Sequence, residues 1–267
     1  MSSFKIYGVI HLPPLTGSPQ NTLEFDHILK LAIHDAGVLC SAHFDGLIIE
    51  NFGDAPFWPG KVQPNTVAQM AVIAHSVRQV VPDGFEIGIN VLRNDPCSAL
   101  AVGQVSKADF IRVNVHSGAA WTDQGLIQGA ARETLNFRKL IGAPSITIYA
   151  DILVKHASAA GVDDPIILAK DTVYRAGAGG LIFTGSGTGQ PCDLEPLKQI
   201  KSELPNVPIW IGSGVIPEQI GDVVQLADGA IIGTYLHKDS NITLPLCPIR
   251  CSEINDARCL ALKSSVL

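Results

Sequence analysis

The chain has 267 residues and a net charge of −6, with 46% hydrophobic and 16% charged residues. This length fits one large domain better than two ordinary ones, and a mean hydropathy of +0.26 argues against disorder. Lys and Arg are dispersed without a basic run, which argues against nucleic-acid binding. No stretch reaches the roughly 18 consecutive apolar residues that a membrane span needs.

The cysteines and the first residues indicate a reducing compartment. The six Cys have neither zinc-finger nor CxxC spacing, so we expect reduced thiols rather than a structural zinc or a disulfide framework. The segment Met1–Lys5 lacks the charged and apolar regions of a signal peptide. We therefore expect a mature protein that starts here and resides in a cytoplasmic compartment.

Eight short apolar runs predict β-strands. Most are continuously apolar rather than alternating, which is typical of parallel strands covered by helices on one side and buried inside a barrel or sheet on the other. In chain order they are Lys5–Ile10, Gly46–Glu50, Glu86–Val91, Asp109–Val115, Ser145–Ala150, Gly180–Thr184, Pro208–Gly212 and Gly229–Gly233.

The segments between these strands show helical features. Residues 70–77 and 220–227 place apolar side chains at positions i, i+3, i+4 and i+7, as one buried helix face requires. Asp164 followed by Pro165 predicts an N-cap and a first helical residue, and Gly177 marks the end of that helix. Strands and helices therefore alternate along the chain.

Eight strand–helix units match a (β/α)8 barrel of about 250 residues. A doubly wound open sheet has the same local alternation and is the main alternative. The count of eight, and the polar or Gly-rich residues after nearly every strand, favour the barrel. We predict a single (β/α)8 barrel domain over residues 1–267, with the barrel at about 4–236 and a C-terminal tail at about 237–267 that holds a helix at Glu253–Lys263.

Active sites of such barrels lie at the C-terminal ends of the strands. Glu50 and Asp151 end nonadjacent strands, so we expect them to face one reacting centre as acid and base. Lys155 and His116 are the further catalytic candidates. Lys155 would pair with an anion or carboxylate, or form a Schiff base as in barrel aldolases. The sequence identifies no cofactor, and a divalent metal held by His and carboxylate groups is an alternative.

Four asparagines lie at or near strand ends, although Asn disfavours strands. Turn chemistry explains one or two of them, and the set suggests a ligand with hydroxyl or amide groups. The ligand-binding candidates are Asn51, Asn90, Asn94, Asn114, His11, Arg93, Asp123, Thr184 and Gly185.

The last two strands are followed by glycines and hydroxyls rather than charged groups. TIM barrels often bind phosphate at these two loops, through backbone N–H groups. The predicted phosphate-binding residues are Gly212, Ser213, Gly214, Gly233 and Thr234, and tight turns are the alternative explanation. The run Gly185–Gly189 lacks GxGxxG spacing, so we interpret it as a loop that closes over ligand.

Long motifs of the chain resemble the BtpA family. They include GVIHLPPLTGSP (Gly8–Pro19), DGLIIENFGDAPF (Asp45–Phe57), FIRVNVHSGAAWTDQG (Phe110–Gly125) and DTVYRAGAGGLIFTGSGTGQP (Asp171–Pro191). The resemblance covers nearly all of Phe4–Leu236 and implies a TIM barrel related to the ribulose-phosphate-binding barrels. The family is named after a cyanobacterial protein needed for photosystem I accumulation, found as an extrinsic thylakoid protein. Relatives also occur in non-photosynthetic bacteria, archaea and animals, so photosystem assembly is not the common chemistry.

These features predict an enzyme that binds a phosphorylated sugar or nucleoside-like ligand, for hydrolysis, isomerisation or glycosyl transfer. The alternative is a non-catalytic assembly factor for photosystem I biogenesis, peripheral to the thylakoid. Fold alone does not separate the two, but the density of titratable groups on one rim favours an enzyme. We expect a homo-oligomer without a membrane span, whose partner is the phosphorylated small molecule.

Overall fold

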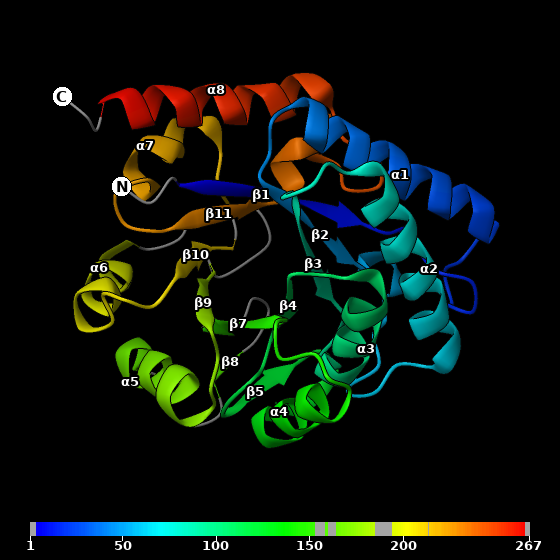
Figure 1. Ribbon diagram of the computed structural model, residues 1–267, viewed down its shortest axis with the longest axis horizontal. Coiled ribbons are helices and arrows are strands. Elements are labelled where there is room, and N and C mark those ends of the chain that lie inside the picture. Colours follow the sequence, from blue (N-terminus) through cyan, green and yellow to red (C-terminus); the bar gives the residue numbers. More distant parts are fainter. Residues whose placement is uncertain (1–3, 153–157, 160–163, 185–193, 213, 265–267) are drawn as a thin grey trace.

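The computed structural model describes residues 4–152, 158–159, 164–184, 194–212 and 214–264. Its centre is a closed barrel of parallel strands in the order β1-β11-β10-β9-β7-β4-β3-β2 (Figure 1). The strands are β1 (Lys5–His11), β2 (Gly46–Glu50), β3 (Glu86–Asn90), β4 (Phe110–Val113), β7 (Thr147–Ile152), β9 (Gly180–Phe183), β10 (Ile209–Ile211) and β11 (Gly229–Ile232). The predicted (β/α)8 barrel is confirmed.

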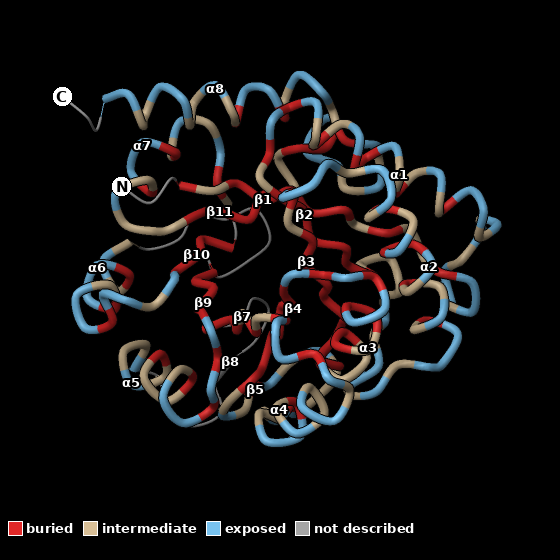
Figure 2. Tube along the Cα trace, viewed as in Figure 1, coloured by how far each residue is buried: buried red, intermediate tan, exposed pale blue. Residues whose placement is uncertain are grey.

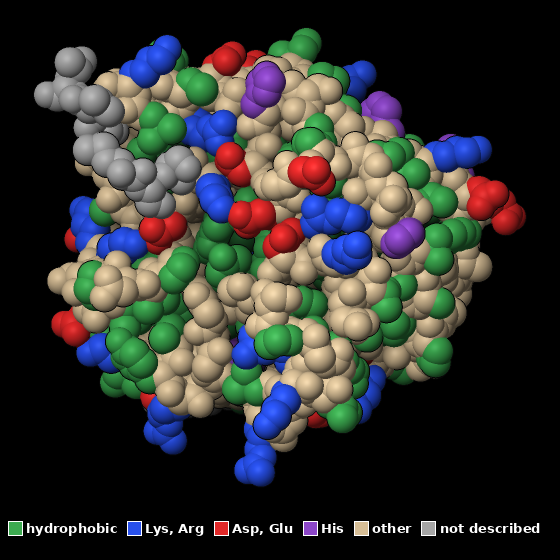
Figure 3. Space-filling model, viewed as in Figure 1, with side chains coloured by type: hydrophobic (Ala, Val, Ile, Leu, Met, Phe, Trp, Pro, Cys, Tyr) green, Lys and Arg blue, Asp and Glu red, His purple; other side chains and the backbone are tan. Residues whose placement is uncertain are grey.

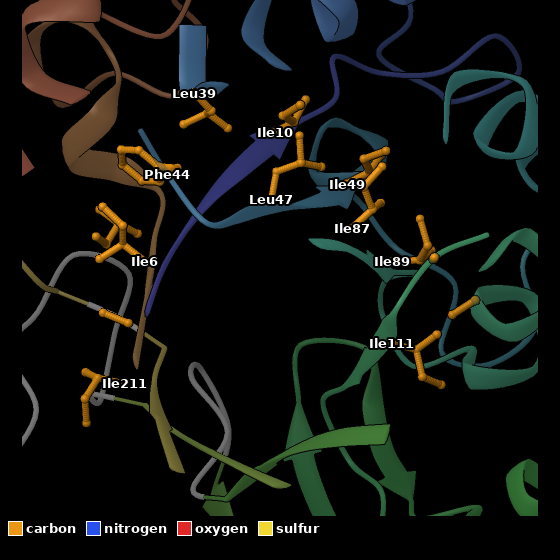
Figure 4. Packing of buried hydrophobic residues seen from close by; sticks show 14 of the residues in the cluster. Ile6, Ile10, Leu39, Phe44, Leu47, Ile49, Ile87, Ile89, Ile111 and Ile211 are labelled. Atoms are coloured by element: carbon orange, nitrogen blue, oxygen red, sulfur yellow. The ribbon is translucent and has the colours of Figure 1, made fainter. Parts of the chain in front are cut away.

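Alternate residues of each strand face the helices. Ile6 and Ile10 of β1 and Ile49 of β2 are fully or almost fully buried in the main core. Figure 4 shows such side chains on the outer side of the strands, near helix residues such as Leu39. The residues between them point into the barrel, as Tyr7 and Val9 do, and form a separate apolar cluster there. This alternation decides which side chains reach the centre of the barrel.

Helices surround the barrel and follow its strands (Figure 1). They are α1 (Phe25–Ser41), α2 (Pro64–Val80), α3 (Pro96–Ser106), α4 (Ala131–Leu140), α5 (Pro165–Lys170), α6 (Leu194–Glu203), α7 (Ile220–Val223) and α8 (Pro248–Ser264). As predicted, the Asp164 side chain caps α5 by accepting hydrogen bonds from Ile166 N and Ile167 N. A π-helical segment, Asp171–Arg175, continues α5.

Burial follows this architecture. In Figure 2 the barrel strands are mostly buried, and the helices alternate between buried and exposed positions. The inward positions of α2 at Met70, Ile73, Ala74 and Val77 are fully buried, which fits the predicted helical periodicity. The periodicity at 220–227 yields a shorter helix, because α7 ends at Val223 and turns follow.

The segment after β11 completes the helical layer. Its helix α8 starts at Pro248, earlier than the predicted Glu253, and packs against α1 and α7 (Figure 1). Cys251 and Ile254 are buried on its inner side. Of the three cysteines in this segment, Cys251 belongs to the packing of the barrel's last helix, whereas Cys259 is exposed.

A small antiparallel sheet at the loops was not predicted. Strands β5 (Ala119–Thr122) and β6 (Gly125–Gln128) form a hairpin between β4 and α4, and β8 (Ser158–Ala159) pairs with β5. The residues between β5 and β6 are Asp123 and Gln124, and Gly125 adopts a φ of +94°, which favours glycine. The hairpin thereby holds Asp123 at a fixed place above the strands.

Aromatic side chains close the N-terminal end of the barrel interior. The Tyr7 ring stacks on Trp210 at a centroid distance of 4.2 Å and on Phe110 at 5.2 Å, and Tyr149 packs against both Phe110 and Trp210. Gly88 makes room for this cluster, because a Cβ there would lie 2.2 Å from the Phe110 ring. The interior is therefore filled at this end.

On the face shown in Figure 3, the acidic and basic side chains of the described residues lie interspersed among hydrophobic ones. Within the described part of the chain, no helix combines the length and the apolar character needed to cross a membrane.

Candidate functional site

The C-terminal ends of the strands bring a ring of inward-facing residues together. Strand pairing places His11 level with Glu50, and Glu50 level with Asn90. A cavity of about 530 Å³ opens above this ring, within the size range of small-molecule sites. The predicted site residues that line it are His11, Glu50, Arg93, Asn114, Asp123, Asp151, Gly212, Gly214, Gly233 and Thr234.

A buried ion pair crosses the floor of the cavity between β4 and β7. Arg112 donates from Nε and Nη2 to the two carboxylate oxygens of Asp151, both at 2.9 Å. Asn114 Nδ2 donates to Asp151 Oδ2, also at 2.9 Å. The Asp151 side chain is only 1% exposed and that of Arg112 7%. This geometry is the bidentate arrangement that fixes both partners in orientation.

The charge of this pair is preserved by its contacts. Burial by itself lowers the pKa of the Arg112 guanidinium, but the charge of Asp151 and its hydrogen bonds outweigh burial and leave that pKa raised. The charge of Glu50 acts in the same direction. Arg112 therefore stays a cation, and its Nη2 lies 3.7 Å from the place where a Cβ would stand on Gly212.

Among the described residues, Glu50 accepts fewer hydrogen bonds than Asp151. Its Oε2 accepts a hydrogen bond of 2.6 Å from Asn90 Nδ2, and the residue is 6% exposed. Among the described residues this is its one hydrogen bond through the side chain. A carboxylate at a cavity wall with a single protein donor keeps lone pairs for a ligand.

The four asparagines divide into two pairs. Asn90 and Asn114 orient the carboxylates just described. Asn51 accepts from Leu92 N at 2.7 Å, and Asn94 both accepts from Val115 N and donates to Val115 O at 2.9 Å. Asn51 and Asn94 thus bond to the backbone beyond the next strand, and neither lines the cavity.

His116 also lies away from the cavity. It is 1% exposed, and its Nε2 donates to Ala176 O at 2.9 Å, so its ring joins the loop after β4 to the end of the π-helical segment. Burial lowers its pKa and keeps the ring neutral. Thr184 follows β9, is buried and does not line the cavity; its Cγ2 lies 2.9 Å from the place where a Cβ would stand on Gly212.

The glycine-rich side of the mouth comes from β10 and β11. Gly212 has no room for a side chain, because a Cβ would lie 2.4 Å from Ile182 Cγ2. Gly214 has a φ of +71°, in the region that favours glycine. Gly233 and Thr234 begin a single 3-10 turn, Thr234–Leu236. Predicted site residues that lie outside the described residues are Lys155, Gly185 and Ser213.

Residues that the sequence reasoning missed also line the cavity. Arg112 is the most important, followed by the aromatic residues Phe52 and Phe57 after β2 and by Tyr235 and Ser240 after β11. Among the residues that the structure describes, no three His, Cys, Asp or Glu side chains come together as a metal site.

The closed parallel barrel defines a TIM-barrel protein, and its polar cavity lies at the C-terminal mouth, where the active sites of this fold are found. The chain belongs to the BtpA family, whose model matches residues 3–258.

Relatives span bacteria, archaea and animals. The photosystem I biogenesis protein BtpA of Synechocystis is 39% identical, covering 97% of this chain and 89% of that protein. An uncharacterized protein of Methanocaldococcus jannaschii is 44% identical, covering 88% of this chain and 87% of that protein. An uncharacterized, mitochondrial protein of Caenorhabditis elegans is 33% identical, covering 86% of this chain and 83% of that protein.

Solved structures share the fold at low sequence identity. Phosphoribosyl anthranilate isomerase from Thermus thermophilus gives a TM-score of 0.61 at 9% identity, covering 97% of this chain and all of that one. KGPDC from Streptococcus mutans gives a TM-score of 0.57 at 11% identity, covering 95% of this chain and 97% of that one. At this identity the likeness establishes the barrel architecture alone.

Proposed function

We propose that the chain is an enzyme that acts on a phosphorylated sugar or nucleoside-like small molecule in the cavity at the barrel mouth. The observation that carries the proposal is a cavity of about 530 Å³ that is lined by the Glu50 carboxylate, by the buried cation Arg112 and by the glycine-rich loops after β10 and β11. Hydrolysis, isomerisation and glycosyl transfer all need a group that gives or takes a proton beside a bound anion.

Glu50 is the acid–base group of this proposal. Among the residues that the structure describes, only Asn90 donates to this carboxylate, which orients it and leaves further lone pairs for a ligand. Asp151 is less suited to that role, because three donor groups of Arg112 and Asn114 already bind its two oxygens. We therefore assign Asp151 to the positioning of Arg112. The predicted roles of Lys155 and Gly185 remain part of the proposal.

The proposed phosphate site is the glycine-rich side of the cavity. Gly212, Gly214, Gly233 and Thr234 line the same cavity, and small residues let backbone N–H groups approach an anion closely. Arg112 stands beside Gly212, so its charge would act on an anion bound there. The ligand would then extend from this phosphate toward Glu50, with its reacting atoms between the two.

The test is a thermal-shift screen of sugar phosphates and nucleotides, each compared with its unphosphorylated parent. A true ligand at 100 times its dissociation constant should stabilise the fold by about 2.7 kcal/mol. Gly233→Ala should abolish the preference for the phosphorylated compound, because a Cβ there would lie 2.8 Å from His11 Cε1. The control is Gly221→Ala on α7, where a Cβ meets nothing within 4 Å. Equal shifts for phosphorylated and parent compounds would contradict the proposed phosphate site.

The second candidate function is a non-catalytic assembly factor at the thylakoid. It is favoured by the Synechocystis relative at 39% identity, which is a photosystem I biogenesis protein. The nematode relative weighs against it as the common role of these proteins, since animals have no photosystem. Glu50→Gln separates the two: an enzyme loses turnover, and an assembly factor keeps all its partner interactions.

A further inference from the structure

The segment between β11 and α8 brings a further hydroxyl group to the cavity. It contains two short 3-10 turns, Thr234–Leu236 and Lys238–Ser240, and the second ends at Ser240 on the cavity wall. Ser240 is exposed, so its side chain is accessible to a ligand. Gly233 and Thr234, which the proposed function assigns to phosphate, line the same cavity. Ser240 therefore borders the space in which these two residues would hold an anion.

The contacts of the Ser240 side chain leave its proton available. Arg250 Nη1 donates to Ser240 Oγ at 2.7 Å. An arginine side chain has no acceptor, so this bond uses a lone pair of Oγ and not the hydroxyl proton. Among the described residues this is the one hydrogen bond of the Ser240 side chain. A hydroxyl that accepts from a cation is polarised by it and becomes a stronger donor.

Arg250, in the first turn of α8, also fixes the segment that carries Ser240. Its Nη1 lies within hydrogen-bond distance of Tyr235 O, at 2.9 Å, and of His237 O, at 3.2 Å. Its guanidinium lies over the Tyr235 ring, 4.7 Å from the centroid, and the Tyr235 hydroxyl donates to Glu253 Oε2 at 2.6 Å. Two side chains of α8 thus hold the backbone and the aromatic ring of this cavity-lining segment.

The backbone of Ser240 supports a role for its side chain. Asp239 and Ser240 both have a φ of +55°, in the left-handed region that favours glycine. The other described non-glycine residues with positive φ, His43 and Lys107, follow the ends of α1 and α3, where this conformation commonly terminates a helix. Ser240 lines the cavity instead, and strained residues cluster at ligand sites.

We propose that Ser240 is a phosphate-binding residue that donates its hydroxyl proton to a phosphate oxygen, and that Arg250 is the positioning residue that holds and polarises this hydroxyl. The inference rests on the proposed function and adds a side-chain donor to the backbone N–H groups of the glycine-rich loops. A polarised hydroxyl bonds most strongly to an anionic acceptor, which a phosphate oxygen provides. The last helix of the barrel thereby takes part in ligand binding without touching the ligand.

The experiment is a titration of the full chain with inorganic phosphate, followed by the backbone amide signals of Gly233 and Ser240 in ¹H–¹⁵N NMR spectra. Both signals should shift along one binding curve. Ser240→Gly removes the hydroxyl and introduces the residue favoured at this φ, so the fold should be kept while the phosphate affinity, read from Gly233, falls about tenfold. Unchanged affinity would overturn the proposal.

The matched control is Asp239→Gly, which makes the same backbone change one residue earlier and keeps the hydroxyl. It should bind phosphate at least as tightly as the wild type, because it also removes an exposed carboxylate. Equal losses of affinity in Asp239→Gly and Ser240→Gly would show that backbone freedom in the turn, and not the hydroxyl, weakens binding, and would overturn the proposal.

Variants of Arg250 test whether it acts through Ser240. Arg250→Met should weaken phosphate binding in the wild type and have little further effect in the Ser240→Gly background. An effect of equal size in both backgrounds would refute the positioning role. Arg250→Lys provides the same comparison if the Met variant does not fold. The control Arg258→Met changes another arginine of α8, which bonds to Asp45 and to His43 O, and should leave the affinity unchanged.

The two amide signals distinguish this inference from the proposed function. A response of Gly233 with unchanged affinity in Ser240→Gly supports the glycine-rich phosphate site and refutes the role of Ser240. Binding that shifts Ser240 but not Gly233, and that Ser240→Gly weakens, supports the hydroxyl donor and contradicts the glycine-rich site. No response of either signal contradicts both.

Discussion

The two ends of the barrel interior are built from the same strands and have opposite character. At the N-terminal end, Tyr7, Phe110 and Trp210 pack ring on ring and fill the space. Further along the strands, carboxylates, amides and Arg112 surround an open cavity. The packed end therefore contributes stability, whereas the end where apolar packing stops is available for chemistry.

The largest expected effect is on stability at the filled end. Trp210→Ala removes a ring that is 3% exposed and stacked on Tyr7, so the free energy of unfolding should fall by about 3–5 kcal/mol. Urea denaturation measures this change. Binding of a phosphorylated ligand by the folded fraction should be unaltered; a large loss of affinity would break the division between the two ends.

The next effect tests whether the open end also carries stability. Arg112→Met leaves Asp151 as a buried charge without its cation, which should cost about 3 kcal/mol. The double variant Arg112→Met, Asp151→Leu removes both charges and should regain most of that loss without regaining ligand binding. Urea denaturation and ligand titration of both variants provide the measurement. A double variant as unstable as the single one would show that packing, not charge, dominates at this site.

Matched carboxylates at the two ends give the third prediction. Glu50→Gln should reduce turnover by at least about 100-fold, near 2.7 kcal/mol in activation free energy, with little change in stability. The control is Glu86→Gln at the filled end, where the carboxylate accepts hydrogen bonds from Tyr7 and Lys5. Steady-state kinetics should show Glu86→Gln close to the wild type. Retained activity in Glu50→Gln would exclude Glu50 as the acid–base group.

The smallest effect concerns His116, which is near the open end but outside the cavity. Because burial lowers its pKa in the folded state, an unfolded chain takes up the proton first as the pH falls below about 6.5. The stability that neutral His116 contributes is therefore complete above that pH and is lost as the pH falls toward the folded pKa, by at most about 1.4 kcal/mol per pH unit.

His116→Gln should accordingly flatten the dependence of unfolding free energy on pH between about 6.5 and 5.5. The exposed His75→Gln is the control and should leave the slope unchanged. Chemical denaturation at several pH values measures both slopes. Identical slopes for wild type and His116→Gln would show that this ring is not held neutral by the fold.

Much of this arrangement follows from sequence patterns, because the strands and their polar ends are local features. Arg112 was missed since it lies inside a strand rather than after one. Strand alternation would have revealed it: Phe110, Arg112 and Asn114 occur at every second position and face the barrel interior together. The same alternation separates Asn90, which follows this inward pattern at the end of β3, from the neighbouring Asn94 in the loop beyond.

Other features depend on contacts that no local pattern contains. The β5–β6 hairpin consists of short strands stabilised by pairing with each other and with β8, and it alone explains why Asp123 reaches the cavity. The predicted Ser145–Ala150 strand is β7, which runs on to Ile152, so Asp151 lies within the sheet. The contact between His11 and His237 needs the barrel to close before it exists.

Asn51 and Asn94 have a consequence for binding thermodynamics. Each side-chain amide bonds to the backbone beyond the following strand, so the loops after β2, β3 and β4 are tied to one another in the protein without ligand. Conformational entropy of these loops is then lost during folding rather than at the moment of association. A ligand that reaches this side of the mouth binds to loops that are already ordered. Its binding free energy therefore contains no cost for ordering these loops.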